Sequence, residues 1–559
     1  MLCARVLTEN AALADKAFDY LVPEGVTLGV GDRVRVNLNG RSVRGWVIDE
    51  GDVAVATKPL TAWLGYGPGP QGVDLARYVA QRWYGPLSRV LTSMSPARLV
   101  KELPEPARTS APTLASSAAL MEPGLVVFGP CEDPFDLVLG VATAPLDGPR
   151  LILAPSEGYA TRLAARLRRH GVEVAGPDEW AKQRAEWPVI VGARGAALAP
   201  CSRVGGVVVL DADDESYRSD SQPTWWAPQV ALERARRDNS PWWMTSSAPS
   251  LDLALVGEPR WRESASWWPR VQVVDRRISD PHDGVLDRHA LGVVRRALEG
   301  SEEVAAVVVL QRLGGGRLFA CRACRELCRC AVCAQAEIRV GEVMTCLEFH
   351  ERRAVFCRSC GSTALRAVRS GVTTLARDVA ALTSQPVSEV TASTKEGPLE
   401  RIVVGTEAAL HRVRRCAVVV FADFDQYLLA PREGARSRAL GVVARAGRLV
   451  GPRHREGEGV VIQTRRHDDL IRALETGLVR PVIDAERDEA RLLGLTPYEA
   501  PTYVVGDGAA QWTADLDVAG LRRREVEGGV VVRHADPARI PEALSRLPRP
   551  TTSLRVRVW

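Results

Sequence analysis

Apolar runs and amphipathic stretches alternate through the middle of the chain. Such runs, separated by segments with helical spacing such as residues 159–170, are typical of parallel strands covered on both faces by helices. The pattern predicts one α/β domain over residues 121–283 and a second over residues 284–480. The runs that predict their strands are residues 125–128, 150–154, 188–191 and 206–211 in the first domain, and 304–310, 401–405, 417–421 and 459–462 in the second.

The two ends of the chain carry shorter elements. Residues 1–98 begin with alternating apolar and polar positions and end with helical spacing at 74–83, which predicts a small β-rich domain. Residues 99–120 are rich in Pro, Ser and Ala and predict a linker. Residues 481–559 predict a helix at 485–493 and a small αβ domain that ends in a strand at 553–558.

Composition narrows the class of protein. The chain has 559 residues, enough for three to five domains, and 46% of them are hydrophobic, which is ordinary for a globular protein. We expect no membrane span, because no apolar run reaches about 18 residues, and no secretion signal at the N-terminus. The four isolated cysteines, Cys3, Cys131, Cys201 and Cys416, fit a reducing cytoplasm. A net charge of +5 is weak evidence for a polyanionic partner.

The other eight cysteines lie between residues 321 and 360 and predict a metal-binding module at 318–365. Four thiolates at about 2.3 Å close a tetrahedral zinc site, and such a short stretch needs a metal because it cannot build a large apolar core. An iron–sulfur cluster would use the same ligands, but three Cys-x-x-Cys pairs suit two zinc ions better. The predicted ligands of the first ion are Cys321, Cys324, Cys357 and Cys360.

The second predicted zinc ion is one ligand short. Cys330, Cys333 and Cys346 supply three thiolates, and Phe349 stands where a fourth cysteine would complete a pair. His350 is the fourth ligand in our prediction, and Cys328 is an alternative.

Several short motifs occur in a fixed order along the chain. They include Phe18-Asp19-Tyr20, Leu210-Asp211, the cysteine module, Gly405-Thr406 and Arg445-Ala446-Gly447-Arg448. Together they resemble the PriA family, the replication-restart helicases also called primosomal protein N′. The resemblance implies a multidomain α/β protein: a β-rich N-terminal DNA-binding domain, two RecA-like helicase lobes with a zinc-binding insertion in the second, and a small αβ C-terminal domain. The family's winged-helix domain has no room in the linker and is expected to be missing.

The resemblance also implies a pocket for the 3′ end of a DNA strand. Its predicted residues are Phe18, Asp19, Tyr20, Gly40 and Lys58. A carboxylate can accept a hydrogen bond from a free 3′-OH, an aromatic ring can stack on a base, and a Lys can meet a phosphate. Without the resemblance, core packing of the aromatic rings and a solvated charge on Lys58 would be the better explanation of these residues. The tandem tryptophans at 225–226, 242–243 and 267–268 are further candidates for base stacking, with core packing as the alternative.

The motifs that bind ATP in this family are degenerate here. The turn at Gly129 should carry a Lys that reaches the phosphates, but Lys182 is the only Lys between Lys101 and Lys395. Ala212 follows Asp211 where the family has its catalytic Glu.

Like charge and missing donors weaken the turn further. Glu132 and Asp133 place negative charge where a triphosphate would lie, and Pro130 and Pro134 remove backbone donors. We therefore expect two zinc ions, treat ATP as a doubtful cofactor, and assign no catalytic residue. Arg445 and Arg448 match the family's arginine-finger motif, with a structural role or a DNA phosphate contact as the expectation.

These observations predict a replication-restart protein that recognises stalled or abandoned forks and helps assemble the primosome. The expected partners are forked and single-stranded DNA, single-stranded DNA-binding protein, primosome proteins, and the replicative helicase or its loader. The alternative is an active ATP-dependent 3′→5′ DNA helicase of the same family. A zinc-ribbon transcription or RNA-processing factor is a third reading, which predicts no preference for a recessed 3′-OH.

Overall fold

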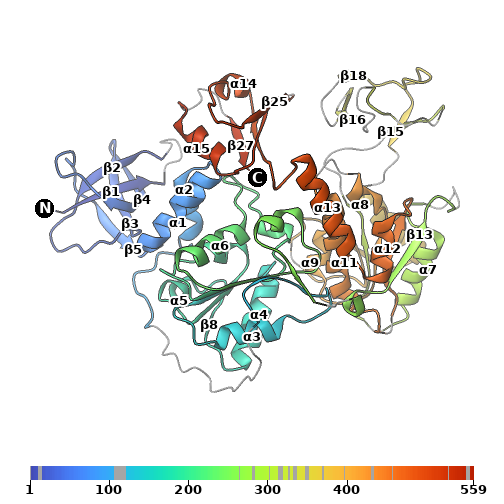
Figure 1. Ribbon diagram of the computed structural model, residues 1–559, viewed down its shortest axis with the longest axis horizontal. Coiled ribbons are helices and arrows are strands. Elements are labelled where there is room, and N and C mark those ends of the chain that lie inside the picture. The colour runs from blue at the N-terminus through green and yellow to red at the C-terminus, as the bar shows by residue number, and fades with distance from the viewer. Residues whose placement is uncertain are drawn as a thin grey trace.

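The computed structural model (Figure 1) describes most of the chain. The described residues are 2–9, 15–105, 121–262, 265–279, 284–300, 302–311, 319–324, 326, 328–331, 337–340, 342–346, 352–367, 371–395, 397–429, 433–455, 457–526, 528–548 and 554–558. Most of the predicted linker, residues 106–120, lies outside them.

The N-terminal domain is an antiparallel sheet backed by two helices, α1 (Gly69–Arg82) and α2 (Leu87–Met94). The strand order is β2-β1-β4-β3-β5, and a bridge from Leu21 to Pro59 adds a further contact at the β2 edge. Trp46, Trp83 and Met94 are buried between the sheet and the helices. The strands are β1 Cys3–Thr8, β2 Ala17–Leu21, β3 Arg33–Leu38, β4 Arg41–Glu50 and β5 Ala62–Gly65.

The first lobe contains a seven-stranded sheet in the order β12-β6-β11-β10-β7-β9-β8, with every strand pair parallel. Its strands are β6 Gly124–Val127, β7 Arg150–Leu153, β8 Val174–Ala175, β9 Val189–Gly192, β10 Gly206–Val209, β11 Trp242–Ser246 and β12 Arg260–Trp261. Its helices are α3 Phe135–Thr143, α4 Glu157–Arg169, α5 Trp180–Arg184 and α6 Ala227–Arg237.

The second lobe repeats this architecture with six parallel strands in the order β13-β23-β22-β14-β21-β20. The first of them, β13, pairs with β23, although the sequence assigned residues 271–275 to the first lobe. Its strands are β13 Val271–Asp275, β14 Val304–Val309, β20 Val387–Val390, β21 Ile402–Gly405, β22 Cys416–Phe421 and β23 Gly459–Thr464. Its helices are α7 Arg288–Ala297, α8 Val372–Thr383, α9 Ala408–Arg412, α10 Asp425–Leu428, α11 Ala435–Val450 and α12 Asp469–Thr476.

The cysteine module follows β14 and stands out from the second lobe (Figure 1). It consists of a pair of strands, β15 and β19, and a three-stranded sheet in the order β16-β17-β18. The bounds are β15 Phe319–Cys321, β16 Glu337–Val340, β17 Val343–Cys346, β18 Arg352–Ala354 and β19 Leu365–Ala367.

After α13 (Arg480–Leu493), the chain ends in an antiparallel sheet with the order β25-β26-β24-β27. The remaining elements are β24 Ala500–Val505, α14 Ala509–Trp512, β25 Arg522–Val526, β26 Gly529–His534, α15 Arg539–Arg546 and β27 Arg555–Val558. These domains confirm the predicted fold class.

One hydrophobic core joins three of these domains. It contains Trp83 from the N-terminal domain, Val209 and Trp225 from the first lobe, and Val530 and Val556 from the C-terminal sheet. Hydrogen bonds cross the same boundaries, among them one from Trp180 Nε1 to the Met94 carbonyl at 2.8 Å. Most of the tandem tryptophans serve this or another core, since Trp225, Trp226, Trp243 and Trp268 are buried and Trp267 is 37% exposed.

Candidate functional site

The turn after β6 contains Gly129, where the sequence predicted a degenerate phosphate loop. The Gly129 N–H donates to Glu132 Oε2 at 3.3 Å, and the Phe135 N–H at the start of α3 donates to Asp133 Oδ1 at 3.0 Å. Backbone N–H groups at a helix N-terminus ordinarily bind the oxygens of an anion. Here the chain's own carboxylates accept these hydrogen bonds.

Both carboxylates also have arginine partners in the first lobe. Glu132 forms an ion pair with Arg262 at 2.8 Å, and Asp133 forms one with Arg166 at 2.6 Å. The turn is thus neutralised locally by protein groups. A cavity of about 190 Å³ lies beside it, lined among others by Gly129, Tyr159, Asp211 and Arg448.

Asp211, which the sequence predicted to mark a second ATP motif, follows β10. Its N–H donates to Thr245 Oγ1 at 3.0 Å, and its carboxylate forms a two-pronged ion pair with Arg448 of α11. The next side chain, Ala212, is fully buried.

Arg448 contacts both motifs of the first lobe at once. Its Nε donates to the Pro130 carbonyl at 3.0 Å and its Nη2 donates to Ser247 Oγ at 3.2 Å. One turn earlier on α11, Arg445 forms an ion pair with Asp214. Both arginines of the predicted finger motif thus bind carboxylates of the opposite lobe.

Burial and neighbouring charges shift the pKa values of three groups near the cleft. Burial would raise the pKa of Asp214, but Arg445 outweighs it and the pKa lies below its usual value. Burial and the neighbouring Asp211 raise the pKa of Asp213 to about 7. Burial and Arg445 lower the pKa of His411 to about 4, so this imidazole is neutral at pH 7.

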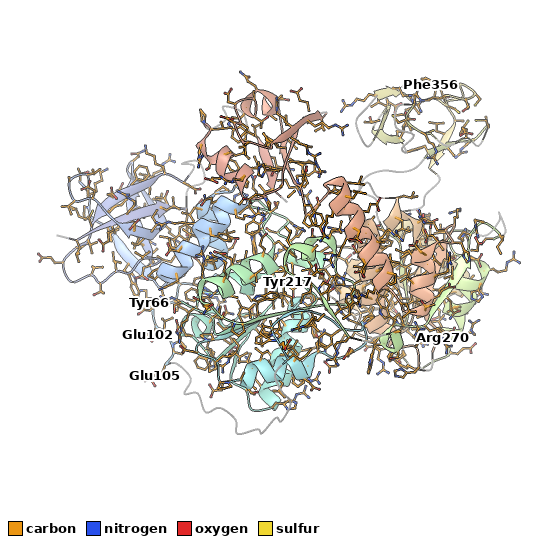
Figure 2. All side chains as sticks on the ribbon, in the orientation of Figure 1. Tyr66, Glu102, Glu105, Tyr217, Arg270 and Phe356 are labelled. Carbon is orange, nitrogen blue, oxygen red and sulfur yellow. The ribbon has the colours of Figure 1, made fainter. Side chains whose placement is uncertain are left out.

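Tyr217, labelled in Figure 2, supports the end of β10. It is fully buried, and its hydroxyl donates to the Leu210 carbonyl at 2.7 Å. This bond fixes the backbone immediately before Asp211.

The cysteine module brings four predicted ligands together. The sulfurs of Cys321, Cys324, Cys357 and Cys360 all lie within 4.8 Å of one another, with Cys321–Cys360 and Cys324–Cys357 separations of 3.4 and 3.5 Å. Four Zn–S bonds of 2.3 Å in a tetrahedron require S···S distances of about 3.8 Å. The donor set therefore fits a zinc ion with only small adjustments.

Local backbone geometry creates this arrangement. The Ala323 N–H donates to Cys321 Sγ at 3.3 Å, and Gly361, at φ +73°, turns the chain so that its N–H reaches the Cys357 carbonyl at 2.8 Å. Glycine adopts this left-handed conformation without strain.

The second predicted zinc site falls largely outside the described side chains. Cys333 and His350 lie outside the described residues, and of Cys346 only its place at the end of β17 is described. Cys330 is buried. Cys328, the alternative ligand, packs in a small apolar cluster with Phe319 and Met344.

The predicted 3′-end pocket centres on β2. Tyr20 is only 3% exposed and its hydroxyl donates to the Asn37 carbonyl at 3.3 Å, so its ring is part of the domain core and does not offer a face for base stacking. Phe18 is half-buried, with Lys16 Nζ 5.6 Å from the centre of its ring. Alternate residues of a strand face opposite sides, so Asp19 faces away from both rings.

Asp19 has a partner that the sequence did not identify. Arg5 lies directly opposite it in the β1–β2 register, and Arg5 Nε is 3.0 Å from Asp19 Oδ1. The Arg5 side chain is 44% exposed and covers Asp19, whose side chain is 9% exposed. The alternation of polar and apolar residues does not determine the register between β1 and β2, and the pair could have been predicted only from that register.

Gly40 and Lys58 approach β2 from two other segments. The Gly40 N–H donates to Asn37 Oδ1 at 2.9 Å, beside the carbonyl that binds Tyr20. The Lys58 carbonyl accepts from the Leu21 N–H at 2.9 Å, and its side chain is exposed. Lys58 thus contacts the end of β2 through its backbone, whereas Gly40 is linked to β2 only through Asn37, whose carbonyl accepts from Tyr20.

Comparison with known proteins defines the class. Residues 5–96 match the family model of the PriA 3′ DNA-binding domain. Replication restart protein PriA of Treponema pallidum is 31% identical over 182 residues, which cover 31% of this chain and 25% of that protein. The probable PriA of Mycobacterium tuberculosis is 26% identical over 418 residues, or 64% of this chain and 62% of the relative.

Two solved structures match the chain at low similarity. Yeast Dbp5 bound to RNA and ADP BeF3 gives a TM-score of 0.35 at 10% identity, covering 65% of this chain and 83% of Dbp5. RecG bound to a three-way DNA junction gives a TM-score of 0.34 at 9% identity, and the match covers 65% of this chain and 44% of RecG.

The class is that of helicase-like proteins with two RecA-like lobes and an added N-terminal DNA-binding domain. Within that class, the chain is similar to PriA proteins, and its N-terminal domain matches the PriA 3′ DNA-binding domain. It spans between a quarter and 62% of the length of the PriA relatives described above. Among the described residues, no helix is long and apolar enough to cross a bilayer.

Proposed function

We propose that this chain is a cytoplasmic replication restart protein that binds abandoned or stalled forks without hydrolysing ATP. The match of residues 5–96 to a 3′ DNA-binding domain supports the DNA target. The exposed Lys58 would meet a phosphate, and Phe18, on the opposite face of β2 from Asp19, would meet a base where the DNA strand passes round this edge of the sheet. Asp19 would accept a hydrogen bond from the 3′-OH after Arg5 swings aside.

One observation supports the proposed absence of ATP turnover: charged side chains of the protein itself occupy the cleft. Glu132 binds the Gly129 amide, and Arg448 binds Asp211 and the Pro130 carbonyl. A triphosphate would have to displace the carboxylate and break the ion pair, without the Lys that compensates such a cost in ATP-driven motors. Ala212 also removes the group that would activate water.

Zinc would order the cysteine module through Cys321, Cys324, Cys357 and Cys360. The second ion, on Cys330, Cys333, Cys346 and His350, remains part of the proposal. In this role the protein would dock primosome proteins, single-stranded DNA-binding protein, and the replicative helicase or its loader.

The test is phosphate release by the purified protein with forked DNA and Mg²⁺–ATP. We expect no turnover above background, together with tighter binding to forks that carry a 3′-OH than to forks that carry a 3′-phosphate. Turnover of about 1 s⁻¹ or faster, within the ordinary enzyme range, would establish the alternative, an active 3′→5′ helicase.

A further inference from the structure

Helix α11 fastens the second lobe to the first through a row of arginines. Arg438, Arg445 and Arg448 form ion pairs with Glu215, Asp214 and Asp211, all of which follow β10 in the first lobe. The spacings of seven and three residues place the three side chains on one face of the helix. A single helix thus supplies three charged contacts across the lobe boundary.

Close backbone approach accompanies these ion pairs. The Cys131 thiol donates to the Gly447 carbonyl at 3.3 Å, which joins the Gly129 turn directly to α11. A Cβ on Gly447 would lie 2.9 Å from Pro269 Cδ, so only glycine allows α11 to come this near. Cavities lined by the same charged residues lie beside these contacts.

Two of the three ion pairs are largely shielded from water, whereas Glu215, the partner of Arg438, is 47% exposed. The side chains of Asp214 and Arg445 are 1% and 15% exposed, and those of Asp211 and Arg448 are 15% and 31% exposed. Salt screens buried pairs much less than exposed ones. Separating the lobes would return both charges to water, so closure depends on the attraction and hydrogen bonds of each pair outweighing the hydration that its charges lose.

In a two-lobed motor the nucleotide bridges the lobes, and its arrival and departure change their separation. We propose that Arg445 and Arg448 take over this bridging role, so that the lobes stay closed without nucleotide and hold single-stranded DNA with an affinity that nucleotide does not regulate. The DNA-binding part of this inference rests on the proposed function. The closure of the lobes rests only on the ion pairs between them.

The experiment combines small-angle X-ray scattering with single-stranded DNA binding, each with and without ATPγS and Mg²⁺. The test variant is Arg445→Ala/Arg448→Ala. The control is Arg436→Ala, which removes an ion pair made by the same helix to Asp469 within the second lobe. Asp211→Asn/Asp214→Asn provides a second test variant that keeps the side-chain shapes if the alanine variant fails to fold.

For the wild type and the control we expect one radius of gyration and one Kd, unchanged by nucleotide within about twofold. The test variants should have a larger radius and bind DNA at least about tenfold more weakly. A wild-type radius that contracts on adding nucleotide, or test variants as compact as the wild type, would overturn the proposal. A protein that keeps its closed radius but binds no DNA would instead refute the proposed function and leave closure intact.

Discussion

Asp19→Ala separates DNA-end recognition from structural support. The Arg5 partner is 44% exposed, so solvent screens the ion pair and the fold should tolerate its loss. A hydrogen bond from a 3′-OH to a carboxylate contributes about 1.5–3 kcal/mol, which corresponds to roughly 10- to 150-fold in Kd. We therefore expect Asp19→Ala to weaken binding to forks with a nascent 3′-OH end by that factor.

The assay is fluorescence anisotropy with two forks that differ only in a 3′-OH or a 3′-deoxy terminus. Wild type should distinguish the two forks and Asp19→Ala should not, while its affinity for plain single strands stays within about twofold. Arg5→Ala is the matched control, because it removes the same ion pair and leaves the carboxylate available. If both variants lose the discrimination equally, or if plain single strands weaken as much as forks, Asp19 does not read the 3′-OH.

Three further predictions concern the metal, the cleft and its pH response. Cys360→Ser should lose one equivalent of zinc by metal analysis while Cys328→Ala keeps it, because Cys360 belongs to the four-sulfur cluster and Cys328 does not. Equal loss of zinc in the two variants would contradict this assignment. Ala212→Glu should give no phosphate release with forked DNA, because the turn still lacks its Lys; turnover would refute the account of the cleft. The pKa of Asp213 is raised to about 7 by burial and Asp211, so its protonated form stabilises the fold at low pH and this contribution is lost as the pH rises through 7. Asp213→Asn should therefore lose less thermal stability than the wild type between about pH 5 and pH 8, measured by differential scanning fluorimetry.

Periodicity and cysteine spacing predicted the elements that depend on local chemistry. The buried parallel strands were predictable from their apolar runs, because strands covered on both faces have no alternation of polar and apolar residues. The Cys321/Cys324 and Cys357/Cys360 pairs predicted their cluster because each pair needs only a tight turn to aim two sulfurs at one point.

What the sequence missed depends on contacts between distant segments. The strand at 271–275 pairs with β23, almost 200 residues later, and nothing in its own pattern distinguishes the two lobes. Tyr20 was a candidate for base stacking, but the alternation of β2 turns its ring into the core. Arg448 was recognised by its motif, whereas its pairing with Asp211 requires the two lobes to be brought together.

The apolar core shared by the N-terminal domain, the first lobe and the C-terminal sheet makes these three parts one cooperative folding unit, although the second lobe has separate cores. A fragment cut after residue 98 would present Trp83 and its neighbours to water and would tend to aggregate. On heating, the two ends of the chain should therefore melt together with the first lobe. The position of the DNA-end domain relative to the lobes is fixed by the same packing that stabilises it.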